Sequence, residues 1–121
     1  MLQLLQAYST DPQTTGNVTV RVSGYSLGTL YGPLAALDIK TWISNGSLPS
    51  TFNLAPVHLC GAVPGFDDAF VDCYTRIITN VTGHFSIHHG RDPVGFGTVF
   101  GHGQMLTPRI FYDSPGSNLT S

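Results

Sequence analysis

The segment 18–39 constrains the fold most, because it places a serine in a glycine-bounded turn between a strand pattern and a helix pattern. Valines alternate with polar residues over Val18–Val22, which favours a strand. Residues 24–28 read G-Y-S-L-G and fit G-x-S-x-G, the sharp strand-to-helix elbow that presents a serine hydroxyl at its tip. Helical spacing follows in Leu27, Leu30, Tyr31, Leu34, Leu37 and Thr41. The sequence therefore predicts a strand, an elbow carrying Ser26 as candidate nucleophile, and a long helix.

The other elbow residues have predicted roles of their own. We expect Gly24 and Gly28 to be glycine because a side chain at either position would collide with the neighbouring strand or helix. Tyr25 completes the turn. The Leu27 N–H lies at the positive end of the helix dipole and is the candidate donor to an oxyanion. The alternative is a chance match in a surface turn, so the predicted strand and helix around it give the motif its weight.

Composition narrows the function classes. The 121 residues suffice for one domain, and a 41% hydrophobic and 10% charged composition is typical of a globular chain. A formal charge of -2 and the lack of a basic run argue against nucleic acid as a partner. No apolar run approaches the roughly 20 residues of a transmembrane segment. No phosphate-binding or dinucleotide-binding motif occurs, and the two cysteines stand in no metal-binding pattern. We expect no cofactor and no metal.

The residues around the elbow resemble a known family. Segments 22–28 and 34–39 resemble the elbow and following helix of the fungal-type (class 3) lipases, usually V-T-G-H-S-L-G followed by L-A-A-L-D-L at this spacing. Tyr25 replaces the usual histidine, and Thr29 and Leu30 replace a pair of small residues. The resemblance implies an α/β fold of the α/β-hydrolase type, with a mostly parallel sheet flanked by helices. It also implies a secreted serine hydrolase of triacylglycerol or related lipid esters, acting at a lipid-water interface.

Asp92 is the candidate acid of a catalytic triad. The segment 87–94 reads I-H-H-G-R-D-P-V and resembles the lipase pattern V-x-H-x-R-D-x-V, in which the aspartate has that role. Independently, an aspartate at the end of a strand, held extended by the following proline, can orient a catalytic imidazole. A surface-turn aspartate is the alternative. The order of serine before aspartate favours the catalytic interpretation.

The catalytic base is the least defined member of the triad. His102 follows Asp92 in the required order and is the candidate base within this chain. By the resemblance, however, His102 corresponds to a structural histidine, and the family's catalytic histidine follows the last strand, beyond Ser121. We expect packing or surface roles for His58, His88 and His89, and a loop position for His84.

The resemblance implies a partial chain. Counterparts of the N-terminal strands, the second oxyanion loop and the C-terminal histidine segment are missing from the 121 residues. We therefore expect one domain over 1–121, a fragment with a flexible tail at 114–121, and little or no turnover by the isolated chain. Feruloyl or other small-ester hydrolysis, and noncatalytic binding on the same fold, are alternative functions.

Further elements follow from local patterns. The expected elements are a helix over 2–8, a loop over 47–55, a strand over 57–60, a helix capped at Asp67 and Asp68, β-prone pieces at 76–81 and 85–88, and a strand within 108–113. Cys60 and Cys73 could form a disulfide or remain free thiols.

Four sequons indicate a secreted glycoprotein. Asn17, Asn45, Asn80 and Asn118 each begin an N-x-[ST] triplet, and these are four of the five asparagines in the chain. The first residues lack the basic and long apolar regions of a signal peptide. We therefore expect an extracellular protein whose natural N-terminus lies upstream.

Overall fold

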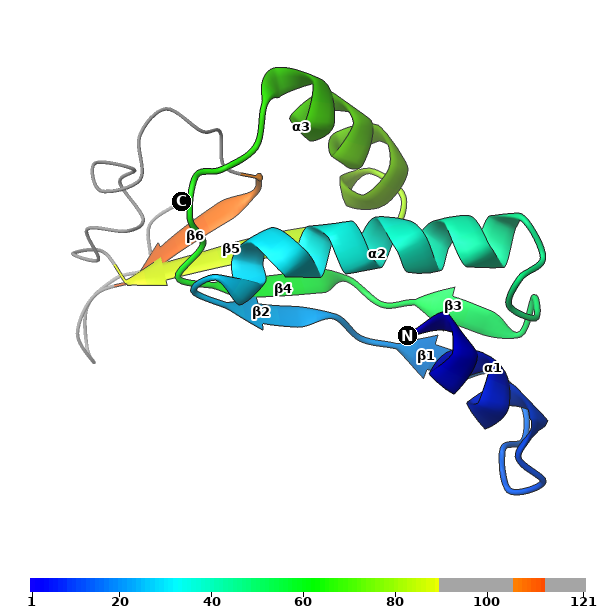
Figure 1. Ribbon diagram of the computed structural model, residues 1–121. Coiled ribbons are helices and arrows are strands. Elements are labelled where there is room, and N and C mark those ends of the chain that lie inside the picture. Colours follow the sequence, from blue (N-terminus) through cyan, green and yellow to red (C-terminus); the bar gives the residue numbers. More distant parts are fainter. Residues whose placement is uncertain (90–105, 113–121) are drawn as a thin grey trace.

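The computed structural model describes residues 1–89 and 106–112. The elements are α1 (Leu2–Thr10), β1 (Val18–Val20), β2 (Ser23–Tyr25), α2 (Gly28–Ser44), β3 (Phe52–Leu54), β4 (Val57–Cys60), α3 (Asp68–Tyr74), the π-helical segment η1 (Thr75–Thr79), β5 (His84–His89) and β6 (Arg109–Tyr112). The predicted tail over 114–121 lies outside the described residues. Figure 1 shows the strands running side by side beneath α2 and α3.

All the described strand pairings are parallel, which confirms the predicted α/β architecture. The larger sheet has the order β2-β4-β5-β6, and β1 pairs with β3 in the register Val18 opposite Phe52. Tyr25 lies opposite Cys60, and Cys60 lies opposite Ile87. Because parallel strands end at a common edge, the residues that follow β2, β4 and β5 come together there.

The core lies between the sheet and one layer of helices. From α2, Ala36 and Ile39 are buried against the sheet residues Val57 and Leu59. Tyr74 of α3 joins the same cluster. In Figure 1, α2 and α3 cover the same face of the sheet. Because side chains alternate along a strand, the opposite face carries the exposed side chains of His58, Cys60 and Phe85.

Helix boundaries follow the sequence signals closely. The Asp67 side chain caps α3 by accepting a hydrogen bond from the Phe70 N–H at 2.7 Å, as the acidic pair predicts. The helix α2 continues past Pro33 and ends at Ser44, and Gly46 takes a φ of +85° just beyond it. Only glycine adopts that conformation at little cost, so Gly46 is a suitable stop for the helix.

Two predicted segments are wrong. Residues 76–81 were expected to be β-prone, yet η1 continues α3 through Thr79 because Ile78 packs fully buried in the helical layer. Here tertiary packing outweighs the β propensity of isoleucine and threonine. The predicted loop 47–55 contains β3, where Phe52 and Leu54 are buried on either side of the exposed Asn53. A strand of three residues gives too short an alternation for sequence patterns to detect.

The predicted loop position of His84 is also wrong, because His84 begins β5 and is 1% exposed. Ser86 Oγ donates to the Leu106 carbonyl at 3.1 Å, so it accepts from His84 Nε2 at 2.7 Å. His84 Nδ1 is then the acceptor for the Tyr74 hydroxyl at 2.8 Å. These buried hydrogen bonds connect α3, β5 and Leu106, which precedes β6. In this arrangement one ring nitrogen of His84 donates and the other accepts, so the imidazole is neutral.

The buried imidazole makes stability depend on pH. Burial lowers the pKa of His84 from 6.5 to about 4, and the nearby charge of His58 makes a smaller contribution in the same direction. Between these values the unfolded chain binds a proton that the folded chain excludes. Stability present above pH 6.5 is therefore lost as the pH falls toward 4, by about 2 kcal/mol at pH 5 relative to pH 7.5.

We expect His84→Gln to remove this part of the pH dependence, because glutamine fills the site without titrating. Urea unfolding at pH 7.5 and pH 5 measures the difference. The variant His58→Gln removes only the smaller cause of the lowered pKa of His84 and should retain most of the fall. An equal fall in wild type and His84→Gln would contradict the assignment to His84.

Candidate active site

Ser26 lies in the turn between β2 and α2, as the sequence predicts. Its side chain is exposed, and its φ of +53° places the backbone in the left-handed region that serine rarely adopts. Its carbonyl accepts from the Thr29 N–H at 2.9 Å, and its N–H donates to the Cys60 carbonyl at 3.3 Å. These bonds hold the hydroxyl at the carboxyl edge of the sheet, where the ends of β4 and β5 also lie.

The space around the two elbow glycines, Gly24 and Gly28, differs. At Gly24, an added Cβ would meet the Gly28 carbonyl oxygen, with the carbonyl carbon at 2.8 Å, so the backbone crossing excludes any side chain. At Gly28, an added Cβ would meet nothing within 4 Å among the described residues. The predicted steric reason is therefore correct for Gly24 and wrong for Gly28.

We expect Gly24→Ala to destabilise the fold by more than about 2 kcal/mol, because rigid backbone atoms would have to move. Gly28→Ala should be neutral or stabilising by up to about 1 kcal/mol, since alanine favours the helix and the site has room. Thermal unfolding of the two variants gives the comparison. Equal losses in both would show that the crossing at Gly24 is not the constraint.

Thr29 joins the elbow to the loop after β4. Its side chain is fully buried, its hydroxyl donates to the Ser26 carbonyl, and the same oxygen accepts from the Val63 N–H at 3.0 Å. In the sequence, Thr29 stands out only as a departure from a small residue, and no role is predicted for it. No local pattern could have revealed this contact, because its partner lies 34 residues away.

An apolar pocket opens beside Ser26. It has a volume of about 450 Å³ and is lined by Ser26, Leu27, Leu30, Val63, Pro64 and Gly65. Leu30 packs closely on Gly65, where an added Cβ would lie 2.6 Å from Leu30 Cδ2. The serine is thus the reactive polar side chain at a pocket whose walls suit a hydrocarbon group.

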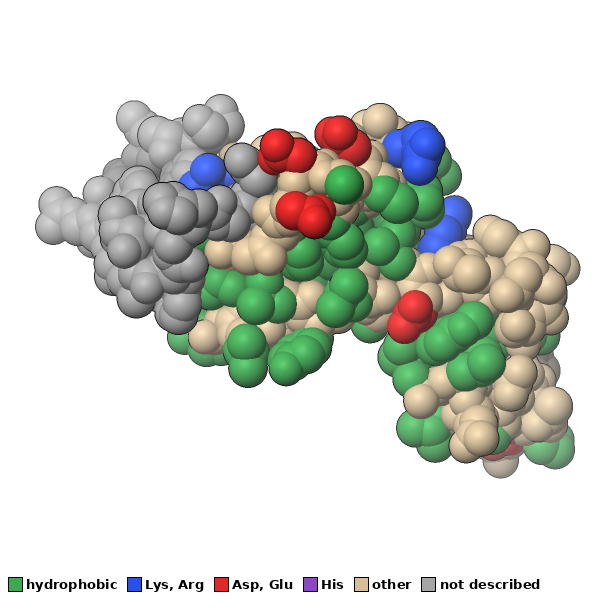
Figure 2. Space-filling model, turned by 45° about the horizontal axis from the view of Figure 1, so that its top comes forward, with side chains coloured by type: hydrophobic (Ala, Val, Ile, Leu, Met, Phe, Trp, Pro, Cys, Tyr) green, Lys and Arg blue, Asp and Glu red, His purple; other side chains and the backbone are tan. Residues whose placement is uncertain are grey.

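Apolar side chains are also exposed around the elbow. Tyr25 is 77% exposed, and Leu27, Tyr31 and Leu34 form an exposed stripe at helical spacing along α2. Figure 2 shows hydrophobic side chains gathered over a broad area of one face of the molecule. Such a patch beside a pocket is typical of a surface that meets an apolar partner.

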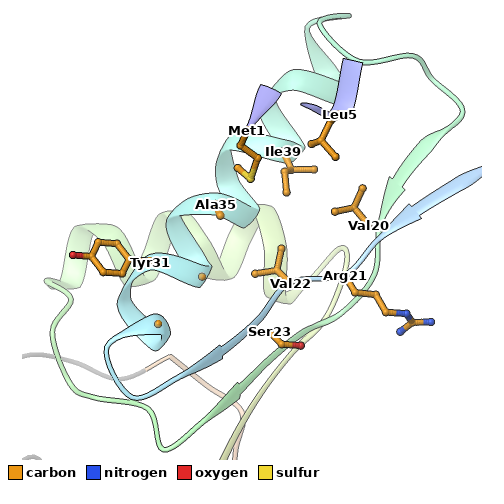
Figure 3. A pocket seen from close by; sticks show the side chains of 11 residues that line it. Met1, Leu5, Val20, Arg21, Val22, Ser23, Tyr31, Ala35 and Ile39 are labelled. Carbon is orange, nitrogen blue, oxygen red and sulfur yellow. The ribbon is translucent and has the colours of Figure 1, made fainter. Parts of the chain in front are cut away.

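A second hollow of about 370 Å³ lies between α1, α2 and the strand residues 20–23, and Ser26 does not line it. In Figure 3, Val20 and Val22 point toward α2, whereas Arg21 points away. The walls from α1 and α2 include Leu5 and Ile39. Of the described residues that line this hollow, Ser23 carries a hydroxyl but lies within β2 and not at a left-handed turn, so the site at Ser26 remains the better candidate for chemistry.

The contacts given for His58 and His84 do not include the Ser26 hydroxyl. His58 is exposed and lies edge-on to Phe85, with ring centroids 5.5 Å apart. His84 is committed to Tyr74 and Ser86, and His88 is fully buried in β5. Surface and packing roles for His58 and His88 agree with the sequence analysis.

Other predicted site residues lie outside the described residues. Asp92, His102 and Asn118 are among them. The strand β5 ends at His89, three residues before Asp92, and its end lies at the same sheet edge as the elbow. In the described ranges, no three histidine, cysteine or carboxylate side chains group in a way that could hold a metal ion. Both cysteines are free thiols.

Comparisons with known proteins support the fold. Neither a family model nor a curated protein matches the chain. Among solved structures, the crystal structure of M37 lipase shares the fold. The match has a TM-score of 0.55 and 19% identity, and it covers 71% of this chain and 24% of the lipase chain. At this identity the likeness shows a lipase-like α/β fold, and this chain spans about a quarter of that protein's length.

Surface features bear on the remaining predictions. The sequon residues Asn17, Asn45 and Asn80 are exposed. The Asn45 side chain accepts from the Ser47 N–H at 2.9 Å within its own sequon. Glycosylation and secretion stay predictions. Among the described residues, none of the helices combines the length and apolar character needed to cross a membrane.

Proposed function

We propose that this chain carries the nucleophile of a serine carboxylic ester hydrolase related to the class 3 lipases. The observation that supports this most is Ser26, exposed at a left-handed turn beside an apolar pocket at the carboxyl edge of a parallel sheet. The lipase-like fold is a second support. We also propose that the lipase-like α/β fold is of the α/β-hydrolase type.

The proposed chemistry proceeds in two steps. Ser26 Oγ attacks the ester carbonyl carbon, the Leu27 N–H donates to the resulting oxyanion, and the carbon-oxygen bond to the alcohol breaks as the alcohol gains the proton. Water then hydrolyses the acyl-serine and releases the acid. Asp92 orients the histidine that transfers these protons, and His102 is the candidate within this chain.

The surroundings of Ser26 favour lipid esters over small polar esters. The pocket walls are apolar, and the exposed stripe of Leu27, Tyr31 and Leu34 begins at the elbow. A lipid-water interface would cover this stripe while the acyl chain enters the pocket. Small-ester hydrolysis and noncatalytic binding are the alternatives, and the latter predicts an unreactive Ser26.

We expect slow but specific reaction of Ser26 with an alkyl fluorophosphonate, which bonds serine through phosphorus and releases fluoride. We expect a slow reaction because a serine hydroxyl is a weak nucleophile without a base, and the resemblance gives this chain no clear counterpart of the family's catalytic histidine. Mass spectrometry of the digested chain locates the adduct. Ser26→Ala should abolish it, whereas Ser23→Ala, at an exposed serine on the adjoining strand, should leave it unchanged.

The outcomes separate the alternatives. An adduct on Ser26 alone, with weak nitrophenyl ester hydrolysis that Ser26→Ala removes, supports the hydrolase. If His102 is the base, His102→Ala should also lower the hydrolysis relative to the wild-type chain. No adduct on Ser26, or equal labelling of Ser23, would favour a noncatalytic role.

Pocket size should set the acyl preference. In Gly65→Ala, the new methyl group would press on Leu30, whose flexible end would move into the pocket. We therefore expect the rate of reaction of Ser26 with a long-chain fluorophosphonate to fall by about tenfold, the lower end of the effect of one methylene group in a pocket, while the rate with a short-chain reagent changes little. Equal effects on both reagents would show that the pocket does not hold the acyl chain.

A further inference from the structure

We propose that Thr29 is a positioning residue that fixes the nucleophilic turn relative to the wall of the acyl pocket. This inference rests on the proposed function of Ser26. Thr29 itself does not line the pocket and touches no reacting atom, so its effect passes through its two hydrogen-bond partners.

The hydroxyl of Thr29 joins two segments that come from different parts of the chain. It donates to the carbonyl of Ser26, the residue with the left-handed backbone, and this carbonyl also accepts the Thr29 N–H at 2.9 Å. The hydroxyl oxygen accepts the N–H of Val63, which is itself buried. One buried side chain thereby holds both the turn and the loop after β4.

Both partners of Thr29 line the pocket. Ser26 provides the nucleophile, and Val63, with its neighbour Pro64, provides part of the apolar wall. A reactive geometry requires the carbonyl carbon of a bound acyl group to lie within a narrow distance of the serine oxygen. The bridge through Thr29 fixes that distance, because the wall holds the acyl chain and the turn holds the hydroxyl.

A second threonine of α2 provides a matched control. The Thr41 hydroxyl donates to the Leu37 carbonyl at 2.8 Å, so it makes the same kind of bond to its own helix, at an exposed position away from the elbow. Thr29 differs because its hydroxyl oxygen also accepts a hydrogen bond from Val63, which lies outside α2. Replacing each by valine keeps the shape of the side chain and removes the hydroxyl.

The experiment compares Thr29→Val, Thr29→Ser and Thr41→Val in the whole 121-residue chain. Two quantities are measured: the rates of Ser26 labelling by octyl and ethyl fluorophosphonates, and the rate of amide hydrogen exchange at Val63. We expect Thr29→Val to slow octyl labelling by about tenfold and ethyl labelling by less, because the wall holds only the longer chain. Exchange at Val63 should rise more than tenfold. Thr29→Ser and Thr41→Val should resemble the wild type in both measurements.

Three results would overturn the inference. The first is a normal octyl-to-ethyl ratio in Thr29→Val, which would leave Thr29 a structural role alone. The second is faster exchange throughout α2 and the sheet in place of a local rise at Val63, which would indicate general destabilisation. The third is absence of labelling in the wild-type chain, which would refute the proposed nucleophile itself. Local exchange at Val63 would then mark Thr29 as a structural bridge only.

Discussion

The close crossing of backbone at Gly24 and Gly28 is the constraint on which the site depends. The carbonyl of Gly28 lies where the Cβ of any other residue at position 24 would have to be. This close contact allows only two residues to connect β2 to α2. So short a connection requires the left-handed backbone of Ser26. The strain of that conformation is offset by bonds to Thr29 and Cys60.

The sheet gives this turn its chemical setting. Since β2, β4, β5 and β6 are parallel, the segments after β2 and β4 meet at one edge, and the pocket forms between them. Burial of α2 and α3 on one face holds these strands, while the chain of Tyr74, His84 and Ser86 fixes β5 from within the core. A neutral His84 serves this structural purpose, which removes it from consideration as the base for Ser26.

Local signals in the sequence succeeded where the physical cause is local. The elbow and the cap at Asp67 each depend on residues within a few positions, and the structure has them where expected. The signals failed where long-range packing decides. Ile78 became helical because it fills the core, and His84 became buried because partners from α3 and β5 satisfy both ring nitrogens.

The sequence by itself determined the strand, turn and helix around Ser26, because alternation, glycine spacing and helical periodicity are properties of neighbouring residues. The parallel α/β class was predicted from the resemblance that these residues carry, and the strand pairings confirm it. Tertiary structure alone decided which residues surround that serine. The pocket walls at Val63 and Pro64, and the bridge from Thr29 to Val63, join residues more than thirty positions apart. Such contacts follow from the packing of α2 against β4, which no local pattern encodes.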